Sequence, residues 1–394
     1  MHDAITITND GELAAVANSG TGTANDPYII AGWNITGSPT HGISVNGTIK
    51  YFKIENCWIG SSNFHGIYVD SIASGTATII KGTCNNNGEN GISLVHSGSS
   101  TITNNTCFDN GGRGISLEDS GSSTVANNIC NSNHYGIRLE HSGSSTIANN
   151  TCNDNDRGIR LFDSDFSTIA NNICNDNGGR GIRLEDSGSS TVTNNICNNN
   201  LYAGISLYVS GSSSVANNTC NNNRDVGISL EFSGSSIVVA NNSCINNDFG
   251  IRIEFSFNDL IVWNMLVGNG AYGIELSGDS DINVIHHNDF VANGQNTSQA
   301  YDNGTDNQWY EETTMEGNYW SDYNGTGSYL IAGSAGTSDP YPSLSPYRYT
   351  DKIDTSSSPS PVFPQEFLAI IGLFVVVIGL SVVVLFVNKR QKSA

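Results

Sequence analysis

The chain has 394 residues, of which 43 are glycine and only 13% are charged, and its formal net charge is −21. This bias toward small and polar residues argues against two or three ordinary globular domains and calls for a search for internal repeats. Before residue 367 there are 13 basic and 37 acidic residues. The resulting charge of −24 repels nucleic acid and excludes it as a partner.

Residues 1–41 are predicted to form an N-terminal cap and the first strands of the fold. Residues 10–17, with the sequence DGELAAVA, predict a short helix that covers the first coil of a solenoid. The opening residues contain no apolar stretch of signal-peptide length. Because Ile5 is already expected inside the fold, we expect the chain as given to lack its true N-terminus. A tail-anchored protein with its body in the cytoplasm is the alternative.

Residues 42–278 consist of a repeat with a period of 22 to 25 residues, marked by eleven Gly-Ile dipeptides. A typical unit reads GISLEDSGSSTVANNICNSNHY. In Gly-Ile-x-Leu the Ile and Leu lie two apart, so they share one face of a strand and x lies on the other. Three short strands separated by turns fit one coil, and a lone coil cannot bury its apolar face. The repeat therefore predicts a right-handed parallel β-helix of about eleven coils.

Stacking turns each repeated position into a column of like residues. One column holds a cysteine in each coil, and we expect these to be free thiols that point into the core. Stacked Cβ atoms lie nearly a strand spacing apart, which is too far for a disulfide. A copper or zinc ladder is disfavoured because a stack offers no tetrahedral arrangement. The column is expected to contain Cys57, Cys84, Cys107, Cys130, Cys152, Cys174, Cys197, Cys220 and Cys244.

The Asn-Asn pairs near the end of each unit predict a second column. Stacked side-chain amides satisfy one another along the axis of a solenoid. We therefore expect a ladder formed by Asn104-Asn105, Asn127-Asn128, Asn149-Asn150, Asn171-Asn172, Asn194-Asn195, Asn217-Asn218 and Asn241-Asn242.

The outward position x of Gly-Ile-x-Leu is arginine in three successive coils, and carboxylates and rings follow two residues later. Stacked guanidinium groups beside aromatic rings suit an acidic sugar chain. The same pattern also fits a solvated ladder of weak ion pairs, or a catalytic strip. The candidate ligand-binding residues are Arg138, Arg160, Arg183, Glu118, Glu140, Glu185, Phe162 and Tyr208.

No catalytic residue, metal site or cofactor is predicted from the repeats. Only a weak Ca²⁺ site is considered, because several aspartates fall in one turn region and carboxylate oxygens are calcium ligands. These are Asp154, Asp156, Asp176, Asp225 and Asp248.

The C-terminal part is predicted to contain four segments. Residues 279–349 form an aromatic cap, and residues 350–366 form a Ser/Pro-rich stalk. Residues 367–387 carry no charge, and 21 residues at ~1.5 Å give roughly 31 Å, enough for a transmembrane helix. The basic tail, residues 388–394, would then lie in the cytoplasm and the bulk of the chain outside the cell.

Three motifs resemble the NosD-type β-helix proteins, especially surface-anchored archaeal members. They are the GIxLxxSxxxTIxNNxC repeat, the opening GTGTANDPYIIAGWNITG, and the closing segment GNYWSDY of residues 317–323 with DPYP of residues 339–342. The resemblance covers nearly all of the chain up to residue 349. It implies a role in maturing the copper centre of nitrous-oxide reductase, alongside an ABC transporter. Of the histidines only His41 and His65 are expected to stack in neighbouring coils, as a metal pair or as polar turn residues.

The predicted fold is all-β: a right-handed parallel β-helix solenoid of about eleven coils, with a short N-terminal cap, an aromatic C-terminal cap and one C-terminal transmembrane helix. The preferred function is a membrane-anchored surface scaffold that binds glycan or a partner protein along an exposed sheet face. A polysaccharide-active enzyme, lyase or hydrolase, that uses the Arg/Glu strip is the alternative. An accessory role in copper-site maturation is the third.

Overall fold

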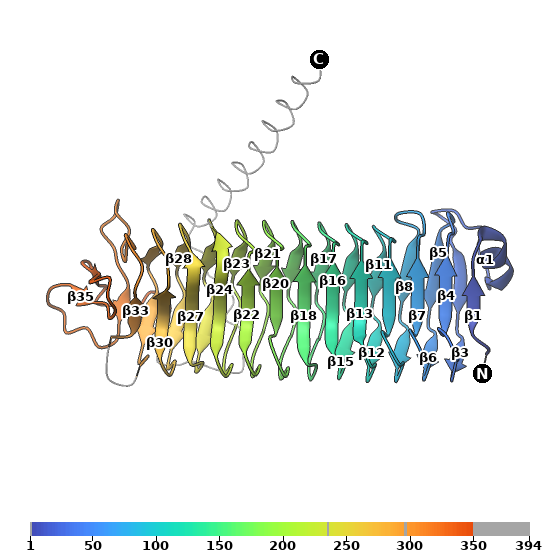
Figure 1. The fold of residues 1–394 in the computed structure, drawn as a ribbon, viewed down its shortest axis with the longest axis horizontal. Coiled ribbons are helices and arrows are strands. Elements are labelled where there is room, and N and C mark those ends of the chain that lie inside the picture. Colours follow the sequence, from blue (N-terminus) through green and yellow to red (C-terminus); the bar gives the residue numbers. More distant parts are fainter. Residues whose placement is uncertain (1, 235, 295–297, 350–394) are drawn as a thin grey trace, which may run out of the picture. The chain divides into compact units, whose positions relative to one another are not determined.

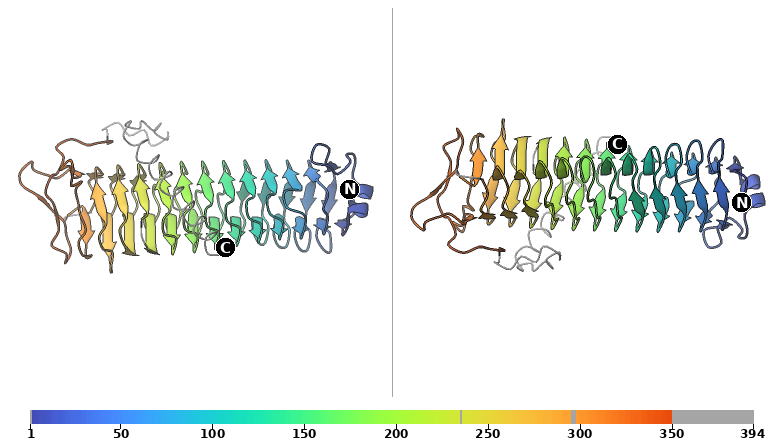
Figure 2. Two further views of the ribbon diagram at one scale, coloured as in Figure 1. Left: turned by 90° about the horizontal axis from the view of Figure 1, so that it is seen from above. Right: turned by 90° about the horizontal axis from the view of Figure 1, so that it is seen from below.

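The computed structural model describes residues 2–234, 236–294 and 298–349, which form a parallel β-solenoid of stacked coils. Figure 1 shows the strands stacked along one axis, with helix α1 (Asp10–Val16) at one end and the closing segment at the other. Figure 2 shows the same stacking from above and below. The predicted repeat architecture is confirmed, because every strand of the main sheets pairs in parallel with its equivalents in the neighbouring coils.

The largest sheet has 13 strands, and all of them except the first and the last are contributed by the Gly-Ile part of a coil. Its strands are β1 (Ile5–Ile7), β4 (Ile43–Asn46), β7 (Ile67–Asp70), β10 (Ile92–Val95), β13 (Arg113–Glu118), β16 (Tyr135–Glu140), β18 (Arg157–Phe162), β20 (Ile182–Glu185), β22 (Ala203–Tyr208), β24 (Val226–Gly234), β27 (Phe249–Ser256), β30 (Tyr272–Ser277) and β33 (Ala300–Asp302).

The second sheet has 12 strands and comes from the Thr-Ile or Thr-Val part of each coil. Its strands are β2 (Tyr28–Ala31), β5 (Phe52–Glu55), β8 (Ala77–Ile80), β11 (Thr101–Thr103), β14 (Thr124–Ala126), β17 (Thr146–Ala148), β19 (Thr168–Ala170), β21 (Thr191–Thr193), β23 (Ser214–Ala216), β25 (Val238–Ala240), β28 (Leu260–Val262) and β31 (Val284–His286).

The third side is formed by short strands around the cysteine position, in sheets of five and four strands. Single bridges, such as the one between Thr151 and Ile173, connect the coils between these two sheets. The strands are β3 (Asn34–Thr36), β6 (Trp58–Gly60), β9 (Thr83–Asn85), β12 (Thr106–Phe108), β15 (Ile129–Asn131), β26 (Ser243–Ile245), β29 (Met265–Val267), β32 (Asp289–Val291) and β34 (Tyr319–Trp320), while β35 (Tyr329–Leu330) and β36 (Ser338–Asp339) form a separate antiparallel pair.

The core is made of four inward columns, as the repeat predicts. Ile137 and Leu139 of β16 and Ile147 of β17 are fully buried, and so is Cys152 on the third side. Each fully buried aliphatic side chain contributes roughly 1.5–3 kcal/mol relative to exposure. The coils therefore stabilise one another by packing like side chains in register, and no coil has a core of its own.

The cysteine column is confirmed from Cys84 to Cys244, but its predicted first member is wrong. The register places Ile59 beside Cys84, so Cys57 lies two positions earlier and outside the column. Ile59 precedes Cys84 and Leu266 follows Cys244 in the same column. The position is therefore occupied by an apolar side chain in each of these coils. All nine cysteines are free and buried.

We expect these thiols to be unreactive until the protein unfolds. Burial raises the pKa of Cys130, Cys152 and Cys174 well above the ordinary value, and the thiolate is the reactive form. Although burial opposes the shift, contacts with Cys197 and Cys244 lower the pKa of Cys220 to about 6. This thiol is fully buried, so a reagent in solution cannot reach it. An aromatic disulfide reagent at pH 8 should therefore label almost no thiol in the native chain and all nine in urea. Rapid labelling of the native chain would contradict the inward orientation of the column.

The asparagine ladder is confirmed for the second residue of each pair, whereas among the first residues in the described ranges the structure shows one such bond, from Nδ2 of Asn241 to Oδ1 of Asn217. Asn149 and Asn171 have φ values of 57° and turn the chain, a conformation that asparagine tolerates better than most residues. Asn150 and Asn172 are buried, and Nδ2 of Asn150 donates to Oδ1 of Asn172 at 3.0 Å. A second amide ladder, not predicted, connects Asn87, Asn110, Asn133, Asn155, Asn177, Asn200, Asn223, Asn247, Asn269 and Asn293.

Both ends of the solenoid are covered. Helix α1 buries Leu13, and its N-cap Asn9 accepts hydrogen bonds from the backbone N–H groups of the first turn. At the other end, Trp320 stacks on Phe290 and on Tyr329, with ring centroids 4.0 Å apart in each pair. The indole N–H of Trp320 donates to buried Asp339 at 2.9 Å. The residues of the closing motif therefore form an aromatic lid with satisfied polar groups.

The predicted transmembrane helix and single-pass membrane localisation are corrected by the structure. A membrane-spanning helix needs about 20 apolar residues, whereas no helix in residues 2–234, 236–294 and 298–349 is long and apolar enough to cross a membrane. Over these described ranges the fold is an all-β parallel solenoid. The segments predicted as stalk (350–366), span (367–387) and cytoplasmic tail (388–394) lie outside the described residues.

Candidate functional site on the outer face of the 13-stranded sheet

The three arginines of the predicted strip lie side by side on the outer face of the 13-stranded sheet. The register pairs Arg138 with Arg160 and Arg160 with Arg183, in strands β16, β18 and β20. Each arginine stands between a buried Ile and a buried Leu, so the alternation of a strand directs its side chain outward. The neighbouring column contains Glu118, Glu140, Phe162, Glu185 and Tyr208, in that order.

The arginines of this strip are neutralised by carboxylates of the chain. Arg138 pairs with Glu140 at 2.7 Å, and Glu185 receives both Arg160 at 2.7 Å and Arg183 at 3.2 Å. Although burial opposes it, the two arginines lower the pKa of Glu185 and keep it charged. The three arginines therefore have little unbalanced charge to offer a ligand.

The two rings of the strip are also engaged within the chain. The guanidinium carbon of Arg160 lies 5.5 Å from the centroid of the Phe162 ring, and that of Arg183 lies 5.5 Å from the Tyr208 centroid. Such cation–π contacts occupy the ring faces that a sugar would need. The predicted strip is thus better described as a ladder of internal contacts.

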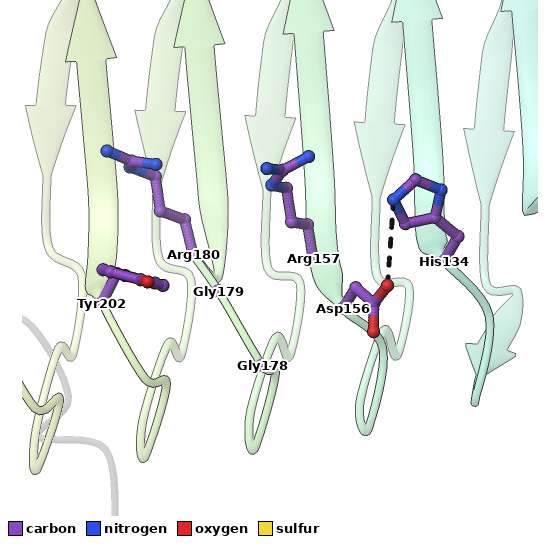
Figure 3. Close-up of a pocket in the computed structure, with 7 residues that line it drawn as sticks. All are labelled: His134, Asp156, Arg157, Gly178, Gly179, Arg180 and Tyr202. Carbon is purple, nitrogen blue, oxygen red and sulfur yellow. Dashed lines mark ion pairs between the residues drawn. The ribbon is translucent and has the colours of Figure 1, made fainter.

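A hollow lies next to this ladder, where the chain enters strands β18, β20 and β22. It has a cavity volume of about 420 Å³. Figure 3 shows the guanidinium groups of Arg180 and Arg157 at its upper edge, the Tyr202 ring below that of Arg180, and the His134–Asp156 pair at the opposite side. The lining residues are His134, Asp156, Arg157, Gly178, Gly179, Arg180 and Tyr202.

Arg157 and Arg180 were missed by the sequence reasoning because the strand alternation breaks before them. Each precedes the glycine of Gly-Ile, and a Cβ placed on that glycine would point inward, 3.1 Å from the Cβ of Cys174 at Gly158. The chain bends there, so the residue before the glycine returns to the outer face. The sequence Arg-Gly-Ile-Arg, at Arg157 and again at Arg180, is the signal that marks this doubling of arginines.

Arg157 is held by a tyrosine. Its guanidinium donates to the hydroxyl oxygen of Tyr135, and the guanidinium carbon lies 5.2 Å from that ring's centroid. Its side chain also passes over Gly179, where a Cβ would come within 3.1 Å of the Cγ of Arg157. The guanidinium is therefore held in place without a carboxylate.

Arg180 has even fewer partners. Its guanidinium carbon lies 5.9 Å from the centroid of Tyr202, and its buried Nε has no hydrogen-bond partner. Burial, and then the nearby Arg183, lower the pKa of the Arg180 guanidinium. Positive charge is thus concentrated at this place in a chain whose net charge is −21.

The predicted stacking of His41 and His65 is confirmed near the first coils. Their ring centroids lie 5.1 Å apart, and Tyr68 stacks on both, at 4.7 Å and 5.2 Å. Nε2 of His65 lies 3.2 Å from a carboxylate oxygen of Glu89. Burial, and then His41, lower the pKa of His65 to about 4. The cluster is therefore neutral at pH 7 apart from its carboxylate.

The residues present do not fit a copper centre. Copper sites in proteins use converging thiolate, thioether or imidazole ligands. The rings of His41 and His65 stack face to face, which does not direct their nitrogens to one point, and the thiols are buried in the core. Among the described ranges, no group of three His, Cys, Asp or Glu side chains is placed to hold a metal ion. The weak calcium site predicted at the aspartates stays a prediction.

The fold and this face define the chain as a right-handed parallel β-helix protein. Residues 14–172 match the family described as "right handed beta helix region", and residues 167–325 match the family described as "periplasmic copper-binding protein (NosD)". The chain is a NosD-type β-helix repeat protein, as the resemblance of its motifs indicates. No curated protein matches the sequence.

Several solved structures are similar to this chain. The A-module of mannuronan C-5 epimerase AlgE4 from Azotobacter vinelandii has a TM-score of 0.53 and 15% identity, over 77% of this chain and 96% of the module. The periplasmic alginate epimerase AlgG has a TM-score of 0.39 and 16% identity, over 74% and 83%. The Dettilon tailspike protein has a TM-score of 0.45 and 12% identity, over 75% and 59%. At these identities the likeness concerns the fold alone.

Proposed function

We propose that the chain is a glycan-binding β-helix that takes a sugar chain along the outer face of the 13-stranded sheet. The observation that carries the proposal is the hollow of about 420 Å³, which combines two guanidinium groups without a carboxylate partner and a tyrosine ring that is 56% exposed. Small-ligand sites typically combine an apolar or aromatic surface with a few directed polar groups.

The arrangement suits a linear polymer better than a compact ligand. The sheet repeats the same outward positions in each coil, at ~4.8 Å per coil, so a long ligand meets equivalent groups as it runs along the axis. Aromatic rings on the same face extend this surface at both ends, with Tyr68 near the first coils and Tyr272 stacked on Tyr301 near the last. A polysaccharide therefore fits the face along its length.

The named neighbours support the proposal only by analogy. The epimerase module of the same fold acts on mannuronan, according to its name, but the shared fold does not transfer that activity to this chain. A protein that binds to the same face is the competing hypothesis. Catalysis on the bound glycan is a further alternative, and the experiment described next also tests for it.

The exposed ring at the hollow provides the test. We expect Tyr202→Ala to weaken glycan binding about tenfold, since a lost ring–sugar contact costs on the order of 1.4 kcal/mol. Retention of the full chain would be measured by affinity electrophoresis on a panel of neutral and acidic polysaccharides. New reducing or unsaturated ends in the same samples would indicate an enzyme.

Phe166→Ala is the matched control, because Phe166 is also an exposed ring, at 62%, but does not line the hollow. It should leave retention unchanged. If no polysaccharide in the panel retains the wild-type chain, the proposal is wrong and a protein partner becomes the better hypothesis.

A further inference from the structure

The arginines of the outer face fall into two groups that differ in their counter-ions. Arg138, Arg160, Arg183 and Arg252 each form at least one ion pair with a glutamate or aspartate of the chain. Among the described residues of this face, Arg113, Arg157 and Arg180 form none, and of these three Arg157 and Arg180 line the hollow. This difference is informative, since the chain contains 37 acidic residues that could supply a partner.

Two neighbouring guanidinium groups without a counter-ion are costly to hold together. Arg157 and Arg180 occupy equivalent positions in adjacent coils, and the backbone N–H of Gly158 donates to the carbonyl of Arg180 at 3.1 Å. Their side chains are partly buried, so water screens their repulsion incompletely. An anion bound between them would remove the repulsion and give the buried Nε of Arg180 a hydrogen-bond acceptor.

The hollow favours a planar carboxylate on a sugar ring over a free ion. Guanidinium groups bind carboxylates through paired N–H donors, and two of them a strand spacing apart offer donors from both sides. The Tyr202 ring lies below the Arg180 guanidinium, as Figure 3 shows, where it can pack against the apolar face of the sugar that carries the carboxylate.

We propose that this hollow is a subsite for a uronic-acid unit, in which Arg157 and Arg180 together bind the carboxylate and Tyr202 packs against the ring. This inference rests on the proposed glycan binding and adds the chemical class of the ligand. The arginines of the neighbouring ladder already have carboxylate partners within the chain, so they do not bind the carboxylate of the sugar.

Asp156 reduces the positive charge of the hollow, so its substitution should strengthen the binding of an acidic glycan, whereas substitution of the arginines should weaken it. Its side chain is 77% exposed and lies 3.8 Å from Nε2 of His134, at the edge of the hollow. A negative charge at this place repels a second carboxylate. Its neutralisation should strengthen the binding of an acidic glycan and leave that of a neutral glycan unchanged.

The experiment compares polygalacturonate with its methyl ester, which has the same sugar backbone without the negative charges. The full chain should bind polygalacturonate at least tenfold more tightly than the ester, as measured by titration calorimetry at fixed salt. The double variant Arg157→Gln/Arg180→Gln should lose at least tenfold in affinity for polygalacturonate and little for the ester. Asp156→Asn should gain affinity for polygalacturonate only.

Arg224→Gln is the matched control, because Arg224 also forms no ion pair within the described part of the chain, is exposed, and does not line the hollow. It removes one positive charge and should change the affinity less than twofold. Equal losses for this variant and for the double variant would indicate general charge attraction and overturn the subsite. The same conclusion would follow from equally tight binding of dextran sulfate.

The two proposals fail in different ways. If the polygalacturonate and its ester bind equally well and the double variant binds like the wild type, glycan binding stands and the carboxylate subsite is wrong. If neither polymer nor any neutral polysaccharide binds, glycan binding itself is wrong. Unfolding midpoints of each variant, measured alongside, separate a lost contact from a lost fold.

Discussion

Gly158→Ala should destabilise the solenoid by about 3 kcal/mol, although it adds a single methyl group. A Cβ at this position would lie 2.3 Å from the carbonyl oxygen of Gly181 in the next coil. That oxygen accepts the hydrogen bond of the Ile159 backbone N–H at 2.9 Å. The oxygen cannot move away without breaking the ladder, and the Cβ of Cys174, 3.1 Å from the new atom, blocks the inward direction.

Gly178→Ala is the control for the lost flexibility of a glycine. Gly178 lies in the turn that follows the same coil, and the nearest atom to its added Cβ is 3.7 Å away, an ordinary contact. Its free energy of unfolding, measured by urea denaturation followed by far-ultraviolet circular dichroism, should stay within about 1 kcal/mol of that of the wild type. If the two variants unfold at the same urea concentration, close packing between the Gly-Ile dipeptide and the next coil does not limit stability.

Asp259→Asn should stabilise the protein at pH 8 by up to about 4 kcal/mol. Asp259 is only 2% exposed, and burial raises its pKa from 3.8 to about 7. Its Oδ1 accepts the backbone N–H of Ile237 at 2.9 Å, while Oδ2 is buried without a partner. The asparagine amide would fit the column, because Nδ2 of Asn283 in the next coil donates to Asn307 at 3.1 Å.

The pH dependence follows from the direction of the shift. The folded chain binds the proton of Asp259 more tightly than the unfolded chain does. The wild type therefore has its full stability below the pKa that Asp259 has in the unfolded chain, and its free energy of unfolding declines as the pH rises toward about 7. Three pH units at 1.36 kcal/mol each give about 4 kcal/mol. The stability difference between Asp259→Asn and the wild type should therefore be small at pH 4 and grow up to pH 7. A difference that does not depend on pH would contradict this assignment.

Asp339→Asn serves as a contrast at another buried carboxylate. Asp339 is fully buried, but both of its oxygens accept hydrogen bonds, from the backbone N–H groups of Asn318 and Tyr341 and from the indole of Trp320. An amide there would direct its own N–H groups at donors and leave them unsatisfied. This variant should be less stable than the wild type at every pH at which the wild type folds.

The candidate site was only partly predictable from the sequence. The position of x in Gly-Ile-x-Leu placed Arg138, Arg160 and Arg183 on one face, and the register bears this out. Their ion pairs were one of three open alternatives, because a column of Arg and Glu does not reveal which carboxylate each arginine reaches. Arg160 pairs with Glu185 of the next coil, whereas Arg138 pairs with Glu140 of its own strand.

The sequence by itself determined the period, the four inward columns and the caps, because stacked coils bury like residues in register and their repetition is visible in one dimension. Only the tertiary structure decided where that register begins and where the alternation breaks. Ile59, and not Cys57, stands beside Cys84, since the pairing of β6 with β9 is set by the packing of whole coils. Arg157 and Arg180 reach the outer face because a bend at the following glycine, required by close contact with the next coil, reverses the direction that strand alternation alone would assign.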